Sequence, residues 1–378
     1  MSSKSGAAAQ VPRLTVVLAL LSTLGPFTID TFFPSMRAMA AEFGISYWQV
    51  QQTLTAYLVP YAFMSLVHGS LADALGRRRV VIAGLLVYVV ASVGCALAPG
   101  FAALLMFRGL QGAVGGVGFI VSRAVVRDCY SGAQAQRVMS AITIVFSLGP
   151  ALAPVIGGWV HVWFGWRAVF ALMASYGLLL SLLVIRKLPE TLPVAQRTPL
   201  HLGASIGNTL AIARHPEFLP LTAASGLCFI ALHTYIGAAP AILLDHWHLT
   251  ATGFAALMLP IIGGYAIGAF FSGRLAGRVL PERQAGMGYT LLLFTTAAML
   301  ALQLLASNPP IIAQQLLLAS TAIGVQLRFP IVTLRILDIF SATRGTAASV
   351  HAFFSLLLGA IMMGGLALGA APAGRSGV

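Results

Sequence analysis

The stretch Gly69-Ser-Leu-Ala-Asp-Ala-Leu-Gly-Arg-Arg-Arg79 decides how this chain folds. It places Asp73 and three consecutive arginines between two apolar runs that are each long enough to cross a bilayer. So short a connection between two spans is a tight turn at a membrane surface. Short basic loops are retained in the cytoplasm, so the arginines predict that this turn faces the cytoplasm.

The composition excludes a soluble protein. Of the 378 residues, 58% are hydrophobic and 8% are charged, whereas a soluble domain carries about a quarter of charged residues. A net charge of +13 would favour nucleic-acid binding in a soluble protein. Here the basic residues lie between apolar runs, so we interpret them as topology signals at a lipid bilayer and expect no nucleic-acid partner.

About eleven stretches are long and apolar enough to span a membrane as helices. We place them at 14–36, 48–70, 79–98, 101–123, 137–161, 166–187, 218–241, 251–273, 285–306, 309–334 and 345–370. The more polar interval 188–217 contains four prolines and predicts a cytoplasmic linker, with a surface helix over 201–214. The expected units are an N-terminal half of six helices (1–187), the linker (188–217) and a C-terminal half of five (218–378).

The distribution of basic residues predicts the orientation. With the N-terminus inside, 17 of the 22 Lys and Arg residues lie on the cytoplasmic side, Arg123 among them. Three lie outside, and Arg108 and Arg328 fall within spans. So one-sided a distribution predicts a multi-pass protein with a cytoplasmic N-terminus.

The opening stretch has an echo in the second half. Gly273-Arg-Leu-Ala-Gly-Arg278 follows the second span of that half, just as Gly69-Ser-Leu-Ala-Asp-Ala74 follows the second span of the first half. Two halves of like topology indicate a duplicated transporter with its site between the halves near the midplane.

Four features together resemble the major facilitator superfamily. Gly69–Arg79 is similar to its loop signature Gly-x-Leu-Ala-Asp-x-x-Gly-Arg-Arg/Lys, and Arg108–Gly112 resembles its fourth-span motif. Gly149–Gly158 resembles the fifth-span motif typical of antiporters. Asp30–Pro34, together with Arg123–Asp128, is similar to the bicyclomycin/chloramphenicol-resistance (Bcr/CflA) group of drug:proton antiporters.

This resemblance implies an all-α membrane protein with two pseudo-symmetric helical halves. It also implies a bacterial inner-membrane location and a transporter that works as a single chain. The family has twelve spans, so we expect the last span to be missing from this chain.

Asp30 is the first candidate for proton coupling. A carboxylate within a span costs about 2.5–3.5 kcal/mol on insertion scales, which makes it a functional candidate by default. Burial disfavours its charged form, so it could take up and release a proton near neutral pH. The alternative is a structural acid paired to an arginine, or one near the outer headgroups.

Arg108 is the predicted partner of Asp30. Asp30 lies about 25 Å from the cytoplasmic start of its helix and Arg108 about 10 Å from the outer start of its own helix, so their depths agree to within about 5 Å. We expect Arg108 to lower the proton affinity of Asp30 in one conformation and to separate from it in the other. A structural arginine bonded to backbone carbonyls is the alternative.

The resemblance also implies a gate at the cytoplasmic surface. Asp73 would contact a neighbouring helix and an arginine at the end of the fourth span, a role that Arg127 matches by position, with Arg77 and Arg78 in the same loop. A purely topogenic loop would explain the arginines but not Asp73. We expect a close, bendable helix contact between the halves from Gly149, Pro150, Pro154, Gly157 and Gly158.

Aromatic residues in several spans could line a cavity for flat, partly apolar compounds, although each alone is more often a packing residue. They are Tyr57, Tyr61, Phe146, Tyr235, Tyr265 and Phe353. Arg328 could bind an anionic group of the substrate, pair with another cavity group or mark a defect. His233 and His351 could join a proton route, or they could be hydrogen-bonded packing residues.

The sequence contains no Walker-type phosphate loop and no catalytic constellation, so we expect neither an enzyme nor ATP-driven transport. The prediction is a proton-gradient-driven exporter of small amphipathic compounds, with no metal and no cofactor. Two alternatives remain open: proton-linked uptake of a small metabolite, and a shortened, non-transporting membrane protein or sensor.

Overall fold

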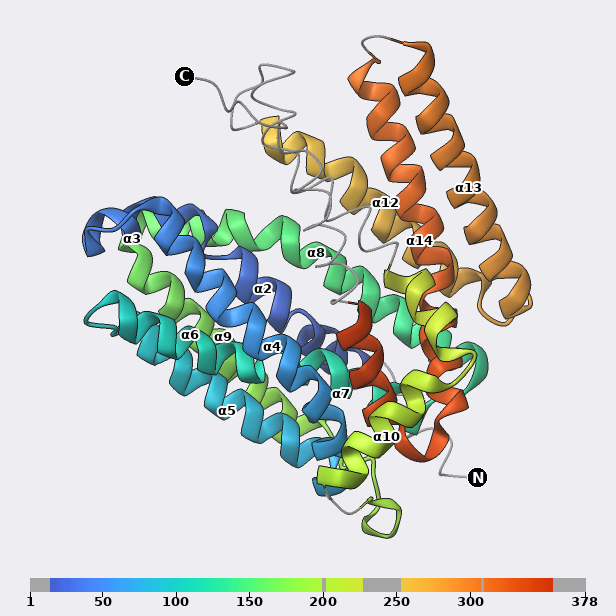
Figure 1. Cartoon of the computed structure of the whole chain (residues 1–378), viewed down its shortest axis with the longest axis horizontal. Helices are drawn as coiled ribbons and strands as arrows, with labels where there is room; N and C mark the ends of the chain where they lie inside the picture. Colours follow the sequence, from blue (N-terminus) through green and yellow to red (C-terminus); the bar gives the residue numbers. More distant parts are fainter. Residues whose placement is uncertain (1–13, 199–201, 227–252, 307–308, 356–378) are drawn as a thin grey trace, which may run out of the picture.

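A computed structural model describes residues 14–198, 202–226, 253–306 and 309–355 of the chain, and almost all of them are helical (Figure 1). Within this part, seven helical segments are long and apolar enough to cross a membrane. The all-helical membrane fold predicted from the sequence is therefore confirmed.

The first span is broken into short pieces. Residues 14–22 are helical, and they are followed by α2 (Leu24–Asp30), η1 (Phe33–Ser35) and α3 (Met36–Phe43). Pro34 lies at the start of η1 and has no N–H to donate to the preceding turn, which explains a break at this point. The rest of the first half comprises α4 (Tyr47–Leu75), α5 (Arg77–Ala96), α6 (Phe101–Gly115), α7 (Val117–Cys129), α8 (Gly132–Phe164) and α9 (Trp166–Lys187).

The predicted linker carries η2 (Val194–Gln196) and α10 (Leu202–Arg214), which confirms the helix expected there. The second half contains α12 (Gly253–Leu275), α13 (Pro281–Leu305), α14 (Ile311–Ile339), η4 (Ser341–Thr343) and helical residues at 218–226 and 344–355. Most of the predicted span at 218–241, with Tyr235 and His233, and the end of the span at 345–370 lie outside the described residues.

The helices of each half pack mainly on one another. In the first half α5 packs along α9 and α4 along α6, and in the second half α12 and α13 both pack on α14. Figure 1 shows the two groups, blue to green in one and orange to red in the other, which meet near α7 and diverge away from it.

The two halves meet through reciprocal contacts that involve both copies of the sequence echo. At the end of α4, the Gly69 N–H donates to Ser349 Oγ at 2.8 Å, in the helical residues 344–355. At the corresponding end of α12, Gln136 of α8 donates from Nε2 to the Ser272 carbonyl at 3.1 Å. The second span of each half therefore docks on the fifth span of the other half.

The glycines of the fifth-span motif face the first span. A Cβ on Gly157 would lie 1.8 Å from the Thr31 carbonyl oxygen, and Gly149 and Gly158 lie against Pro26 and Pro34. The prediction that these glycines form the contact between the halves is therefore wrong. The hydrogen bond from α8 to the second half comes instead from Gln136, nearer the start of the helix, because the glycine face is already filled by the broken first span.

We expect Gly157→Ala to destabilise the protein, because its methyl group would overlap a backbone carbonyl that cannot move without shifting the first span. Overpacking of this kind costs about 1–3 kcal/mol. Thermal unfolding in detergent should occur at a lower temperature than in the parent chain. Gly286→Ala on α13 is the control, since nothing lies within 4 Å of its added Cβ; equal unfolding temperatures for both variants would contradict this account.

Candidate functional site

Asp73 lies at the end of the molecule that carries the Gly69–Arg79 loop, which we call the loop end. Its contacts close this end. Its carboxylate accepts hydrogen bonds from the second half: from the N–H of Gly345 at 3.2 Å, and from the N–H and Oγ1 of Thr346 at 2.9 Å each. Arg77 Nη1 of its own loop donates to it at 2.5 Å. The side chains of Asp73, Arg77 and Thr346 are buried. Asp73 therefore joins the two halves through charge-assisted hydrogen bonds that are shielded from solvent.

Asp128, at the end of α7, extends this network. It accepts from Arg77 Nε at 3.1 Å and from Arg344 Nη1 at 3.4 Å, the latter across the halves. Arg77 is thus held between two carboxylates, Asp73 and Asp128. Arg78 does not take part, because its Nη2 donates to the Ile185 carbonyl of α9 at 2.6 Å.

The predicted contact between Arg127 and Asp73 is wrong. It forms an ion pair with Asp338 of α14 in the second half. Adjacent residues on a helix point about 100° apart, so Arg127 faces α14 while Asp128 faces Arg77. The arginine on Asp73 is therefore Arg77, and Arg127 makes a separate contact between the halves.

The start of the linker is fastened to the same network. Glu190 Oε1 accepts from the Arg77 N–H at 2.9 Å, at the first turn of α5, and Thr191 Oγ1 donates to Asp128 at 3.1 Å. A carboxylate at a helix N-terminus satisfies a free N–H and interacts favourably with the helix dipole. The linker thus packs against the closed loop end.

Asp30 lies at the end of α2, directly before the break in the first span, and is partly buried. Among the described residues, no arginine, lysine or histidine lies within ion-pairing distance of it. A structural role through an ion pair with a described arginine therefore does not apply in this conformation.

Arg108 is fully buried and stays within the first half. It donates from Nε to the Thr53 carbonyl at 3.3 Å and from Nη1 to Gln111 Oε1 at 2.8 Å. Its guanidinium carbon lies 4.5 Å from the ring centre of Phe32 and 4.6 Å from that of Tyr57. The structure does not bring Arg108 and Asp30 together. Arg108 instead bonds to a backbone carbonyl, which agrees with the alternative prediction of a structural arginine.

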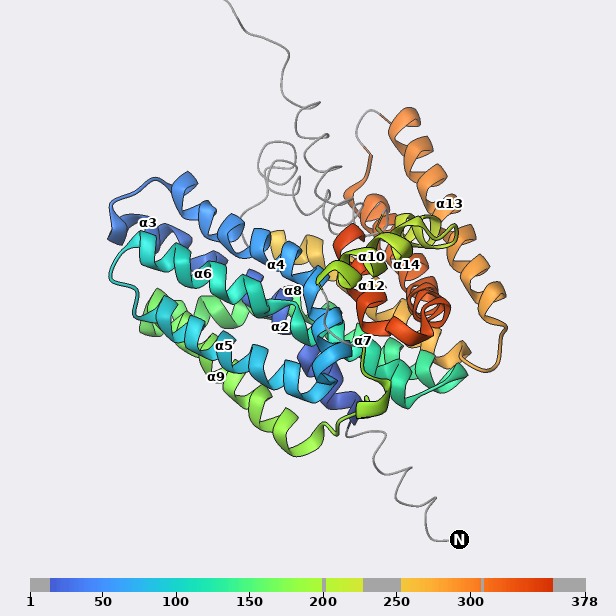
Figure 2. The same cartoon turned by 60° about the horizontal axis from the view of Figure 1, so that its bottom comes forward.

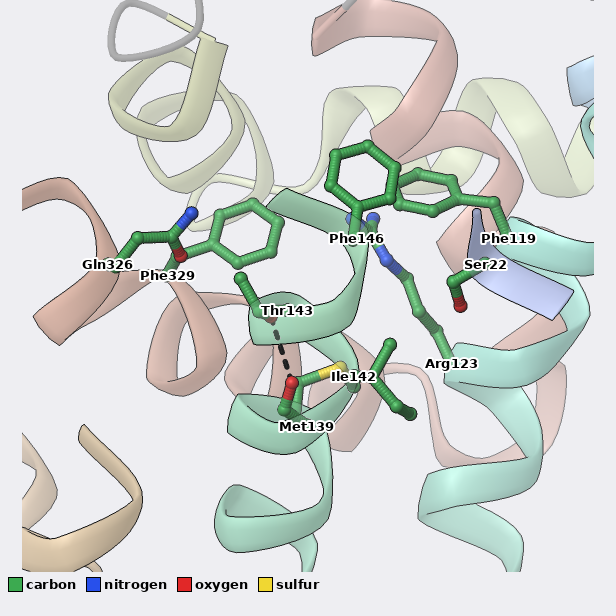
Figure 3. A pocket seen from close by; sticks show the side chains of 9 residues that line it. All are labelled: Ser22, Phe119, Arg123, Met139, Ile142, Thr143, Phe146, Gln326 and Phe329. Atoms are coloured by element: carbon green, nitrogen blue, oxygen red, sulfur yellow. Dashed lines mark hydrogen bonds between the residues drawn. The ribbon is translucent and has the colours of Figure 1, made fainter. Parts of the chain in front are cut away.

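A small pocket lies between the halves, beyond the closed loop end (Figure 3). Its lining comes from the first span, α7 and α8 of the first half and from α14 of the second half. Figure 1 and Figure 2 both show α7, α8 and α14 close to one another. The lining residues are Ser22, Phe119, Arg123, Met139, Ile142, Thr143, Phe146, Gln326 and Phe329. Of the predicted cavity residues, Phe146 lies here.

Arg123 in this pocket was missed as a site residue. From the sequence, Arg123 is predicted to lie at the cytoplasmic surface, because it stands at the end of the apolar run of the fourth span. In the structure α7 continues to Cys129, so Arg123 lies more than a turn inside the helix end and is buried. One signal was available in the sequence. Arg123 precedes Asp128 by five residues, so if Asp128 lies at the end of the helix, Arg123 lies more than one turn inside it.

Of the other predicted cavity residues, those that the structure describes lie in packed surroundings. Tyr57 and Tyr61 stack with ring centres 5.9 Å apart. Tyr265 belongs to a small apolar cluster with residues of α14, and Phe353 packs edge-on against Phe354.

Arg328 is buried on α14, where it donates to the Ala224 carbonyl and lies over the Tyr289 ring, with 4.9 Å between the guanidinium carbon and the ring centre. His351 is hydrogen-bonded to Thr222 Oγ1 at 3.2 Å, as a packing residue would be. Pro154 lies partly buried on α8.

A family model described as Major Facilitator Superfamily matches residues 17–363. The chain is 28% identical to the "Uncharacterized MFS-type transporter YdgK" of Bacillus subtilis, over 92% of this chain and 87% of the relative. It is 30% identical to the "Bicyclomycin resistance protein homolog" of Haemophilus influenzae, over 71% and 67%. It is 31% identical to the "Chloramphenicol resistance protein" of Pseudomonas aeruginosa, over 75% and 66%.

Among solved structures, the fold is similar to that of the proton:xylose symporter XylE, with a TM-score of 0.74 and 12% identity. The match covers 96% of this chain and 89% of that one.

Proposed function

The chain belongs to the major facilitator superfamily, and we propose that it is a proton-coupled multidrug exporter of small amphipathic compounds. Membership makes it a multi-pass membrane transporter. Relatives at about 30% identity carry names of bicyclomycin and chloramphenicol resistance, which supports export of antibiotic-like compounds. The proposal includes a bacterial inner-membrane location, a cytoplasmic N-terminus and units with limits at 1–187, 188–217 and 218–378.

The position of Asp30 is the observation that supports proton coupling. It is a partly buried carboxylate in the first span, and no cation among the described residues neutralises it. A carboxylate in such a place binds a proton more readily than one in water. Protonation from the outside, and release of the proton inside after a conformational change, would link the proton gradient to export.

The contacts at the loop end support alternating access. In the proposed orientation, Asp73, Asp128 and Arg127 close the cytoplasmic side, so the described conformation is one of the two that a rocking transporter needs. Opening to the cytoplasm would break these contacts.

The test is efflux of a fluorescent dye from proteoliposomes with and without an imposed pH gradient. We expect the gradient to raise the efflux rate of the parent chain severalfold and to have no effect on Asp30→Asn, because the amide cannot carry a proton. Glu282→Gln makes the same chemical change at an exposed position on α13 and should behave as the parent. A gradient effect that persists in Asp30→Asn would remove Asp30 from the mechanism.

A further inference from the structure

Arg123 differs from the other buried arginines of the spans. Arg108 and Arg328 both donate to main-chain carbonyls. Arg123 is only 4% exposed, and its guanidinium makes no hydrogen bond or ion pair with any described residue. It lies in the pocket between the halves (Figure 3), so its N–H donors face that space.

No described carboxylate neutralises Arg123. Six of the nine acidic residues bind arginines elsewhere. Asp30 and Glu282 lie farther than ion-pairing distance from it, and Asp245 is outside the described residues. A buried cation without an anion is unfavourable unless something completes the site.

The surroundings of Arg123 are aromatic. Its guanidinium carbon lies 3.8 Å from the ring centre of Phe119 and 5.2 Å from that of Phe329. Phe146 lies beside Phe119, with ring centres 5.2 Å apart and planes tilted by 32°. The rings stabilise the positive charge, but they supply no lone pair to the N–H donors. Gln326 adds a buried Oε1 without a hydrogen-bond partner among the described residues.

We infer that this pocket binds the carboxylate group of a small aromatic anion, held by Arg123 beside Phe119 and Phe329. A guanidinium presents paired N–H donors that match a carboxylate in a bidentate arrangement. Because Phe119 and Phe146 belong to one half and Phe329 to the other, the bound anion contacts both halves. This inference rests on the proposed function, since it names the substrate class of that transporter.

The first experiment compares 2-naphthoate with its neutral counterpart 2-naphthamide on the purified full chain in detergent, by isothermal titration calorimetry. The two probes share a ring and nearly a shape, and they differ in charge. We expect the acid to bind about tenfold to hundredfold more tightly than the amide, the range for a hydrogen bond to a charged group. Equal affinities, or no binding of the acid, would overturn the inference without any variant.

The second experiment repeats both titrations with Arg123→Gln and with Arg186→Gln. Arg186 is an exposed arginine near the end of α9 and serves as the matched control. Arg123→Gln should lose the preference for the acid while keeping the affinity for the amide, whose retained binding also shows that the variant is folded. Arg186→Gln should bind both probes as the parent does. An unchanged preference for the acid in Arg123→Gln would move the anion site elsewhere.

These titrations need no pH gradient and no transport. A transporter that fails the Asp30 test can therefore still bind 2-naphthoate through Arg123, and a proton-coupled exporter can fail these titrations. The two proposals thus succeed or fail separately.

Discussion

Asp73→Asn is expected to shift the balance between the closed and the open loop end by more than a hundredfold toward the open form. The carboxylate accepts from the N–H groups of Gly345 and Thr346 and from Arg77. An amide keeps one acceptor oxygen and turns an NH2 group toward other donors. Hydrogen bonds to charged groups contribute about 1.5–3 kcal/mol each, so a loss of about 3 kcal/mol follows.

Two measurements check this prediction. Efflux from proteoliposomes should slow, and spin labels at the exposed residues Leu75 and Ser341, in a background without the native cysteines, should report a longer distance. Asp338→Asn is the control, because its carboxylate also binds across the halves but is 39% exposed. Exposed ion pairs contribute about 0–1 kcal/mol, so this variant should change the balance by fivefold or less. An unchanged efflux rate in Asp73→Asn would refute the gating role.

Gly69→Ala should have the second largest effect, on the same balance. A Cβ at this position would lie 1.9 Å from the Gly345 carbonyl oxygen, so the loop end could not close without a backbone shift. Overpacking costs of about 1–3 kcal/mol correspond to roughly fivefold to more than hundredfold in the closed-to-open ratio. The same spin-label distance and the same efflux rate measure it.

The echo of the motif supplies the control for Gly69→Ala. Gly273 occupies the equivalent position on α12, but an added Cβ would lie 3.4 Å from Ser140 Cβ, an ordinary contact. Gly273→Ala should therefore transport as the parent does. If both alanine variants close equally well, the close approach of Gly69 to Gly345 is not needed for closure.

The spans that the structure describes, the linker helix and the family could be predicted from the sequence, because each depends on a local or periodic signal. Runs of about 20 apolar residues predict spans wherever they occur. The place of Asp73 in a short basic loop was likewise readable, and the structure puts it in the contact between the halves.

Partners across the molecule could not be predicted in this way. Which face of α7 carries Arg127 depends on where the helix ends and on the neighbouring α14, so its pairing with Asp338 had no signal in the sequence. The burial of Arg123 depends on the length of α7, which a hydropathy limit near residue 123 underestimates. The glycines of α8 were identified correctly as close-contact residues, but their neighbour was not.

The partners of Asp73 in the second half include two main-chain N–H groups. Every residue type except proline provides such a group, so a change of residue 346 leaves one of these bonds in place. Comparison of related sequences should accordingly find Asp73 and Gly345 constrained separately, one for its charge and the other for its small size. Residue pairs that vary together, the usual guide to contacts, should therefore be absent at this contact between the two halves.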